Sequence, residues 1–246
     1  MLGHLFYPWG FILQALAIIH FIRRRPDGYW LFIILIGGAL GALVYFVAEV
    51  VPDLGLLRAP FQRAGRRRRL AELDAIVKEN AAIGNVEELA DVCLEEGQFA
   101  RARELYDKVL ASPQMASVDP YYRRALASLG LGDAAAAAAD LERVVAEEPK
   151  YGFHRAAGLL AQAYALAGRA DLAEAKFKAA VAASTLSETY YNYATFLAAQ
   201  QRTAEAREWA ERILAKKATM PRFARRQERP WFQKAKALLK KLAVQQ

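Results

Sequence analysis

The sequence contains little of the chemistry that enzymes use: one cysteine, three histidines and three methionines occur among 246 residues. A single thiol, Cys93, excludes an internal disulfide. None of the histidines stands in a metal-ligand cluster, and no glycine-rich phosphate loop or nucleophile elbow occurs. The nearest candidate base for Cys93, His154, lies far along the chain. We therefore expect a buried, inert Cys93 and a protein that is not an enzyme and has no metal or cofactor site.

Charge is distributed unevenly along the chain, although the total is only +8. Residues 1–84 carry a net charge of +4, residues 85–214 of −5 and residues 215–246 of +9. A mildly acidic middle between two basic ends is not the pattern of a protein that wraps nucleic acid along its whole length. We therefore expect no nucleic-acid partner for the body of the chain.

Hydrophobic residues make up 55% of the chain and are concentrated at its start. Residues 5–22 and 29–51 are apolar stretches of 18 and 23 residues, separated by a short segment with three arginines. As helices they would reach about 27 and 34 Å, against about 30 Å for the hydrocarbon core of a bilayer. The start of the chain is uncharged, unlike that of a cleaved signal peptide. We therefore predict a retained two-helix transmembrane hairpin over residues 1–57.

Three glycines, Gly37, Gly38 and Gly41, fall in the second apolar stretch. The spacing of Gly37 and Gly41 places small residues on one helix face, where another transmembrane helix can approach closely. The nearest partner is the first helix of the same hairpin, and an oligomer formed through this face is the alternative.

A further pattern in the hairpin consists of Arg24, Arg25, Pro26, Trp30, Gly38, Gly41 and Tyr45. This pattern resembles the N-terminal membrane segment of bacterial cardiolipin synthases, which have phospholipase D-type catalytic domains. The resemblance implies a shared anchor. The catalytic part of that family has a His-x-Lys signature, and no histidine of this chain has a lysine two residues later. The lipid-modifying activity is therefore not implied.

Residues 58–84 read as a basic linker and a lead-in helix. Its arginines favour a contact with anionic lipid headgroups, with a topology signal alone as the alternative; the candidates are Arg63, Arg66, Arg67, Arg68 and Arg69. Because more arginines follow the second apolar stretch than precede it, the positive-inside rule places the rest of the chain on the cytoplasmic side of a bacterial inner membrane.

One pattern of small and apolar residues, which we call the register, recurs four times between residues 85 and 221. Its reference residues are Gly97, Gly132, Gly168 and Gln201, which lie 35, 36 and 33 residues apart. The positions seven residues before and five residues after each reference are all alanine, namely Ala90, Ala125, Ala161 and Ala194, then Ala102, Ala137, Ala173 and Ala206. Small residues at fixed positions let two helices approach, and larger apolar residues fill the space around them.

This register resembles the tetratricopeptide repeat, a helix-turn-helix unit of about 34 residues. It departs from that family at Gln201, where the turn glycine is missing. The resemblance implies an all-α fold in which four helix pairs over residues 85–221 form a right-handed superhelix with a groove for peptides or partner proteins. After the repeats, residues 222–246 are expected to form a basic capping helix with Trp231 on its apolar side, and a lipid or nucleic-acid contact by this helix is a further possibility.

In this family the groove is lined by positions ten and six residues before the reference. The candidates in this chain are Glu87, Asp91, Tyr122, Gln162, Tyr191 and Thr195. Family members that hold the acidic tails of chaperones place Lys, Asn and Arg there, and these residues are absent here. The acidic residues and tyrosines suit a basic or mixed extended peptide, or a helix. For Tyr122 and Tyr191, packing between repeats is the alternative.

Taken together, these patterns predict a membrane-anchored scaffold or adaptor that binds partner proteins or peptides at the bacterial inner membrane. An accessory or regulatory subunit of a membrane lipid-modifying enzyme is the alternative, and a nucleic-acid tether acting through the basic tail is a third reading.

Overall fold

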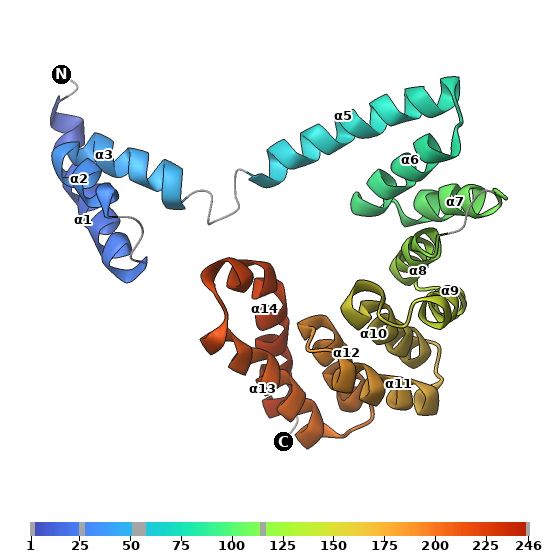
Figure 1. Ribbon diagram of the computed structural model, residues 1–246. Helices are drawn as coiled ribbons and strands as arrows, with labels where there is room; N and C mark the ends of the chain where they lie inside the picture. The colour runs from blue at the N-terminus through green and yellow to red at the C-terminus, as the bar shows by residue number, and fades with distance from the viewer. Residues whose placement is uncertain (1–2, 25–27, 51–57, 114–116, 245–246) are drawn as a thin grey trace. The chain divides into compact units, whose positions relative to one another are not determined.

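The computed structural model describes residues 3–24, 28–50, 58–113 and 117–244, and these residues contain helices and no strand (Figure 1). The all-α prediction is therefore confirmed for the described part of the chain. Contacts divide the chain into two compact units, Met1–Arg69 and Leu70–Gln246. The boundary falls inside helix α5 (Arg58–Glu79). The domain limits predicted at residues 57 and 84 remain predictions.

The first unit contains α1 (Gly3–Arg24), α2 (Tyr29–Ile36), α3 (Gly38–Tyr45) and the π-helix η1 (Phe46–Val50). A small apolar core joins α1, α2 and α3, and consists of Ala17, Trp30, Ile34, Ala42 and Tyr45. Two polar side chains of α1 are tied into it. Gln14 Nε2 donates a hydrogen bond to the Ile34 carbonyl at 2.9 Å, and His20 Nδ1 lies 2.8 Å from the Tyr45 hydroxyl.

The predicted second span is not one helix. Gly37 ends α2, with its N–H bonded to the Ile33 carbonyl, and Gly38 has φ +54°, a left-handed conformation that glycine adopts without steric cost. Gly41 packs so closely on α2 that a Cβ there would lie 1.9 Å from the Ile33 carbonyl oxygen. Gly37 and Gly38 therefore break the stretch, and Gly41 packs within it. The predicted arrangement, in which the glycines line one face of a continuous helix, is not found.

Within the described residues, no helix is both long and apolar enough to cross a membrane. The predicted localisation at the bacterial inner membrane, with the repeats on its cytoplasmic side, is therefore wrong. The second apolar stretch is too short to cross because the break at Gly37 and Gly38 divides it into two helices of 8 residues each.

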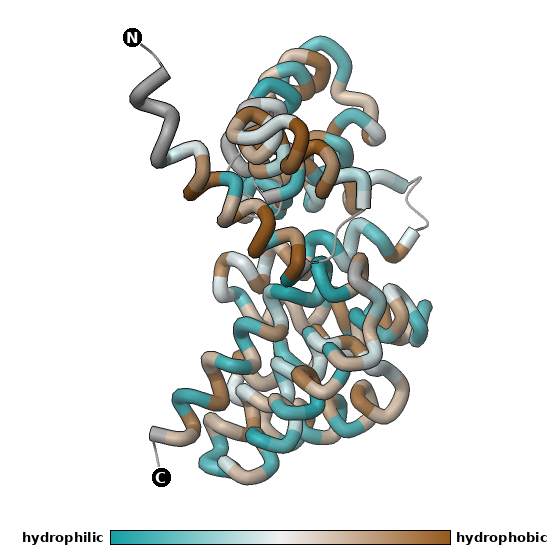
Figure 2. Tube along the Cα trace, turned by 90° about the vertical axis from the view of Figure 1, so that its left-hand side faces the viewer, coloured by the Kyte–Doolittle hydropathy of each residue, from teal (hydrophilic) through white to brown (hydrophobic). Residues whose placement is uncertain are grey.

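The second unit begins with the end of α5 and continues as helix pairs joined by short turns (Figure 1). The pairs are α6 (Ile83–Glu95) with α7 (Phe99–Leu110), α8 (Asp119–Leu131) with α9 (Ala134–Glu147), α10 (Tyr151–Leu166) with α11 (Ala170–Ala183), and α12 (Ser187–Ala199) with α13 (Thr203–Thr219). Along these helices apolar residues alternate with polar ones, as Figure 2 shows.

The small-residue register explains how the helices of each pair approach. All eight alanines at the two fixed positions have no exposed surface. The side chains nine residues after the references are also fully buried, namely Tyr106, Leu141, Phe177 and Ala210. Cys93 is buried in the core around α6 and α7, as expected, and burial raises the pKa of its thiol. Small residues at the crossings and larger ones beside them thus form two apolar cores, one around α6 and α7 and one that runs from α8 to the last helix of the chain.

The turn within each pair has the same geometry in all four repeats. The reference residue is left-handed, with φ +74° at Gly97, +78° at Gly132, +75° at Gly168 and +63° at Gln201. The N–H after it bonds to the carbonyl five residues earlier, at 2.8 to 3.0 Å, which satisfies the end of the first helix. Gln201 therefore adopts the conformation of the glycine that it replaces.

Ion pairs connect successive second helices at equivalent positions. Arg103 of α7 pairs with Asp133 at the start of α9 at 2.7 Å, and Glu174 of α11 pairs with Arg202 at the start of α13 at 2.8 Å. In each pair, the first partner lies six residues after its own reference. The second partner directly follows the reference of the next repeat. All four side chains are partly exposed, so these pairs set orientation more than they add stability.

The last helix, α14 (Arg222–Val244), packs against both α12 and α13. Its apolar side consists of Phe232, Ala235, Leu238 and Leu242, all buried in the core that they share with the last three helix pairs. A helix that covers the final apolar face is what a repeat array needs at its end. The exposed side carries lysines, among them Lys236, Lys240 and Lys241.

Candidate functional site

The groove positions inferred from the register all fall on the first helices of the pairs. Glu87 and Asp91 lie on α6, Tyr122 on α8, Gln162 on α10, and Tyr191 and Thr195 on α12. These residues share a register position but not a common environment. Four of them make hydrogen bonds or ring contacts between or within repeats. The other two, Glu87 and Tyr191, have a carboxylate and a hydroxyl for which the described residues provide no hydrogen-bond partner.

Asp91 is engaged between repeats. Its Oδ1 accepts hydrogen bonds from the Tyr106 hydroxyl at 2.5 Å and from Arg123 Nη1 at 3.0 Å. Arg123 also pairs with Asp119, and Asp119 accepts a hydrogen bond from Tyr151. Burial and the bond to Asp91 raise the pKa of Tyr106 far above its ordinary value. The charge of Asp91 is thus compensated inside the protein, so this carboxylate stabilises the contact between the first two repeats.

Glu87, one turn earlier on α6, differs from Asp91. Its side chain is half-buried, and within the described residues it has neither a hydrogen bond nor an ion pair. Burial raises its pKa, and the negative charges of Asp91 and Asp119 raise it further, while Arg123 opposes the shift. A carboxylate in this position is poorly solvated and lies in a negative field. It would be stabilised by a cation supplied from outside the chain.

Tyr122 packs between repeats. Only 8% of its surface is exposed, and its ring centroid lies 4.7 Å from that of Tyr151 at the start of α10. Burial raises the pKa of its hydroxyl. Its position matches the packing alternative that we considered for this residue.

Gln162 and Thr195 are both engaged by Asn192 of α12. Gln162 Oε1 accepts a hydrogen bond from Asn192 Nδ2 at 2.8 Å, and the Thr195 hydroxyl donates to the Asn192 carbonyl at 2.8 Å. The Gln162 contact joins two repeats, whereas the Thr195 bond stays within one helix. The Gln162 amide oxygen and the Thr195 hydroxyl therefore each already have a hydrogen-bond partner within the chain.

Tyr191 is partly exposed, and its ring centroid lies 5.9 Å from that of Trp231 on α14. No hydrogen-bond partner for its hydroxyl is found among the described residues. The aromatic ring is therefore packed against α14, and the side chain is only partly exposed.

A position nine residues before the reference, which is not among the predicted groove positions, also makes contacts between repeats. Arg123 and Asn192 both occupy it, and each reaches the residue six before the reference in the preceding repeat, Asp91 and Gln162 respectively. The signal was present, since polar residues recur at both positions in complementary pairs. It becomes visible only when the positions of adjacent repeats are compared with each other.

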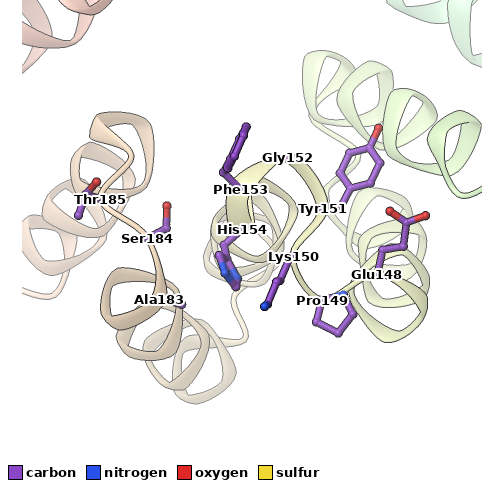
Figure 3. Close-up of a pocket in the computed structure, with 10 residues that line it drawn as sticks. All are labelled: Glu148, Pro149, Lys150, Tyr151, Gly152, Phe153, His154, Ala183, Ser184 and Thr185. Carbon is purple, nitrogen blue, oxygen red and sulfur yellow. The ribbon is translucent and has the colours of Figure 1, made fainter.

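The structure also has a concave region away from the predicted groove positions, lined by the loop before α10, the start of α10 and the loop before α12 (Figure 3). Its volume is 1060 Å³, and its lining includes Lys150, Phe153, His154 and Ser184. Gly152, Phe153 and His154 are all left-handed, and the side chains of Phe153 and His154 point in opposite directions. The described residues contain no group of three or more His, Cys, Asp or Glu side chains placed to hold a metal ion.

The predicted lipid contact falls partly beyond what the structure describes. The side chains of Arg63, Arg66 and Arg67 lie outside the described residues, while Arg68 and Arg69 are exposed on α5. No observation on the described residues tests the lipid contact, which stays a prediction.

Comparisons with known proteins agree with the repeat register. Residues 122–188 match the family model described as tetratricopeptide repeat. Comparison with curated proteins found no match. No match supports the resemblance of the N-terminal hairpin to that of cardiolipin synthases.

Several solved structures have a similar fold. YrrB, a TPR protein with an unusual peptide-binding site, is 18% identical over 63% of this chain and 79% of its own, with a TM-score of 0.50. MamA is 17% identical over 64% of this chain and 92% of its own, with a TM-score of 0.54. A tetratricopeptide repeat protein from Parabacteroides merdae is 15% identical over 95% of this chain and 84% of its own, with a TM-score of 0.52. At these identities the likeness shows the fold alone.

Proposed function

We propose that this tetratricopeptide repeat protein is an interaction scaffold whose groove binds an extended segment of a partner protein, and that the segment is basic or of mixed charge. The observation that carries the proposal is the contrast between two carboxylates on α6. Asp91 is compensated by Arg123 and Tyr106, whereas Glu87 has no partner among the described residues. A half-buried carboxylate without a partner destabilises the folded state, and a basic side chain of a ligand would remove that cost.

The fold supports an extended ligand. The first helices α6, α8, α10 and α12 present equivalent positions in succession, so a ligand that crosses them meets Glu87 at one end and Tyr191 at the other. Neighbouring helices pack about 8–10 Å apart, which puts these ends on the order of 30 Å from each other. An extended chain advances about 3.3 Å per residue, so about ten residues suffice to reach both.

The test is binding of fluorescein-labelled peptides of about ten residues to the full chain, followed by fluorescence anisotropy. One peptide contains an arginine pair near one end, and the other has citrulline at the same positions. We expect tighter binding of the arginine peptide, and we expect Glu87→Gln to weaken it about tenfold, the size of one lost charge-assisted contact.

Glu95→Gln is the matched control, because Glu95 is an exposed glutamate on the same helix. It removes the same charge from another place and should leave the affinity nearly unchanged. Equal losses in the two variants would show that binding depends on net charge and not on the groove, and would refute the proposal.

A further inference from the structure

The junction between the last repeat and the capping helix combines two aromatic rings with a lysine. The ring centroids of Tyr191 on α12 and Trp231 on α14 lie 5.9 Å apart. Lys234 Nζ lies 4.2 Å from the centroid of Trp231 and 5.6 Å from that of Tyr191. We call these three side chains the junction site. Because Tyr191 is a groove position, the junction site extends the groove from the repeats onto α14.

Two other lysines of the unit have hydrogen-bond partners, and one of them, Lys216, also lies over a ring, 4.1 Å from the centroid of Tyr190. Lys178 pairs with Glu174 at 2.9 Å, and Lys216 donates to the Thr185 carbonyl and, at 3.3 Å, to Ser187 Oγ. Within the described residues, Lys234 has no carboxylate partner, and its contacts are the two rings. A cation over an aromatic face is held in place by the ring but keeps its N–H donors for other groups.

The surroundings of the junction site are positive. Residues 215–246 have a net charge of +9 and contain one acidic residue, Glu228. The charge of Glu228 acts on Lys216, whose pKa it raises against the stronger lowering by burial. The junction site thus offers an ammonium group and a phenolic hydroxyl, both hydrogen-bond donors, next to a basic segment of the chain. Two donors beside an apolar platform match the chemistry of a carboxylate.

We propose that the junction site binds a carboxylate of the peptide ligand, either an acidic side chain or the C-terminal carboxyl group. The inference rests on the proposed peptide-binding function and makes it more specific. The ligand would lie in the groove with its basic part at α6, beside Glu87, and its carboxylate at α14, beside Lys234. The capping helix would then form part of the binding surface in addition to covering the apolar core.

The experiment uses the full chain and labelled peptides with an arginine pair at the N-terminal end, a serine–glycine spacer, and a varied C-terminal end. The three ends are glutamate with an amidated terminus, glutamine with a free carboxyl terminus, and glutamine with an amidated terminus. We expect one or both of the peptides that carry a carboxylate to bind about tenfold more tightly than the uncharged one. Which of the two binds more tightly identifies the source of the carboxylate.

Lys234→Gln should remove that difference, and Lys236→Gln should preserve it, because Lys236 is an exposed lysine of the same helix outside the junction site. Tyr191→Phe should reduce the difference without abolishing binding. If the carboxylate has no effect, or if the two lysine variants weaken binding equally, the junction site is not a carboxylate site. Arginine-dependent binding that still responds to Glu87→Gln in that case leaves the proposed function intact, whereas loss of both effects overturns both proposals.

Discussion

The contact between α10 and α12 makes a quantitative prediction, because one glycine allows it. A Cβ added at Gly158 would lie 2.5 Å from Thr189 Oγ1, 3.0 Å from its Cγ2 and 3.2 Å from its Cβ. Thr189 is 1% exposed, and its branched side chain has few rotamers to move into. Gly158→Ala therefore forces two first helices apart at the middle of the groove.

The magnitude follows from two opposing effects. Ala is favoured over Gly in a helix by about 1 kcal/mol, and a methyl group forced into a close-packed contact costs about 1–3 kcal/mol. Gly84 on α6 isolates the first effect, because a Cβ there meets no atom within 4 Å, so the difference between the two variants measures the second. Gly84→Ala should raise the free energy of unfolding by up to about 1 kcal/mol. Gly158→Ala should fall about 1–3 kcal/mol below Gly84→Ala, since the helix preference is common to both.

The assay is thermal and urea unfolding of the full chain and the two variants, followed by far-ultraviolet circular dichroism. In a unit of this size 1 kcal/mol corresponds to a shift in Tm of about 2–4 °C. The double variant with Thr189→Ala should recover part of the loss, because the two closest atoms are removed, so the two substitutions should not be additive. If both glycine variants are stabilised equally, or if the double variant is fully additive, the close contact at Gly158 does not exist.

Three further predictions use the same unfolding measurements. Ala137→Leu should lower the free energy of unfolding by about 1–3 kcal/mol or more, because Ala137 is fully buried at a helix crossing. Ala135→Leu, at an exposed position of α9, should change it little. Equal effects would mean that the register is misassigned. Gln201→Gly should stabilise the fold by up to about 1 kcal/mol, since glycine removes the cost of a left-handed φ of +63° but adds freedom to the unfolded chain, and a destabilised variant would contradict this reasoning. Glu87→Gln should stabilise the free protein at neutral pH, because the pKa of Glu87 is higher in the folded state than in the unfolded state. The ionised carboxylate therefore lowers stability as pH rises through the unfolded-state pKa and then the folded-state pKa, and has no such effect below both. A gain in the variant that persists at low pH would point to another cause.

The correction of the N-terminal prediction has a local cause. Apolar length and composition indicated a continuous second helix, yet the chain turns at Gly37 and Gly38, and Gly41 packs on the Ile33 carbonyl. A run of glycines permits both a helix–helix contact and a helix break, because it has no side chain that disfavours either. The choice between them depends on packing against α1, which the sequence does not state.

The sequence by itself determined the repeat architecture of the second unit. Alanines at two fixed positions and apolar residues beside them can be buried together only by paired helices, so periodicity was sufficient to predict the crossings and the capping helix. It was also sufficient to mark Gln201 as the exceptional turn, although not to show that this turn keeps the same geometry as the other three.

Only the tertiary structure decided which of the predicted groove residues have partners elsewhere in the chain. Asp91 and Glu87 are equivalent by residue type and lie one turn apart, but Arg123 of the next repeat compensates one and not the other. Lys234 is one of several lysines in a basic tail until α14 packs on α12 and brings it to Tyr191. Hydrogen bonds and charge pairs between repeats depend on distances of a few ångströms across helices that are far apart in sequence, and residue spacing along one chain does not contain those distances.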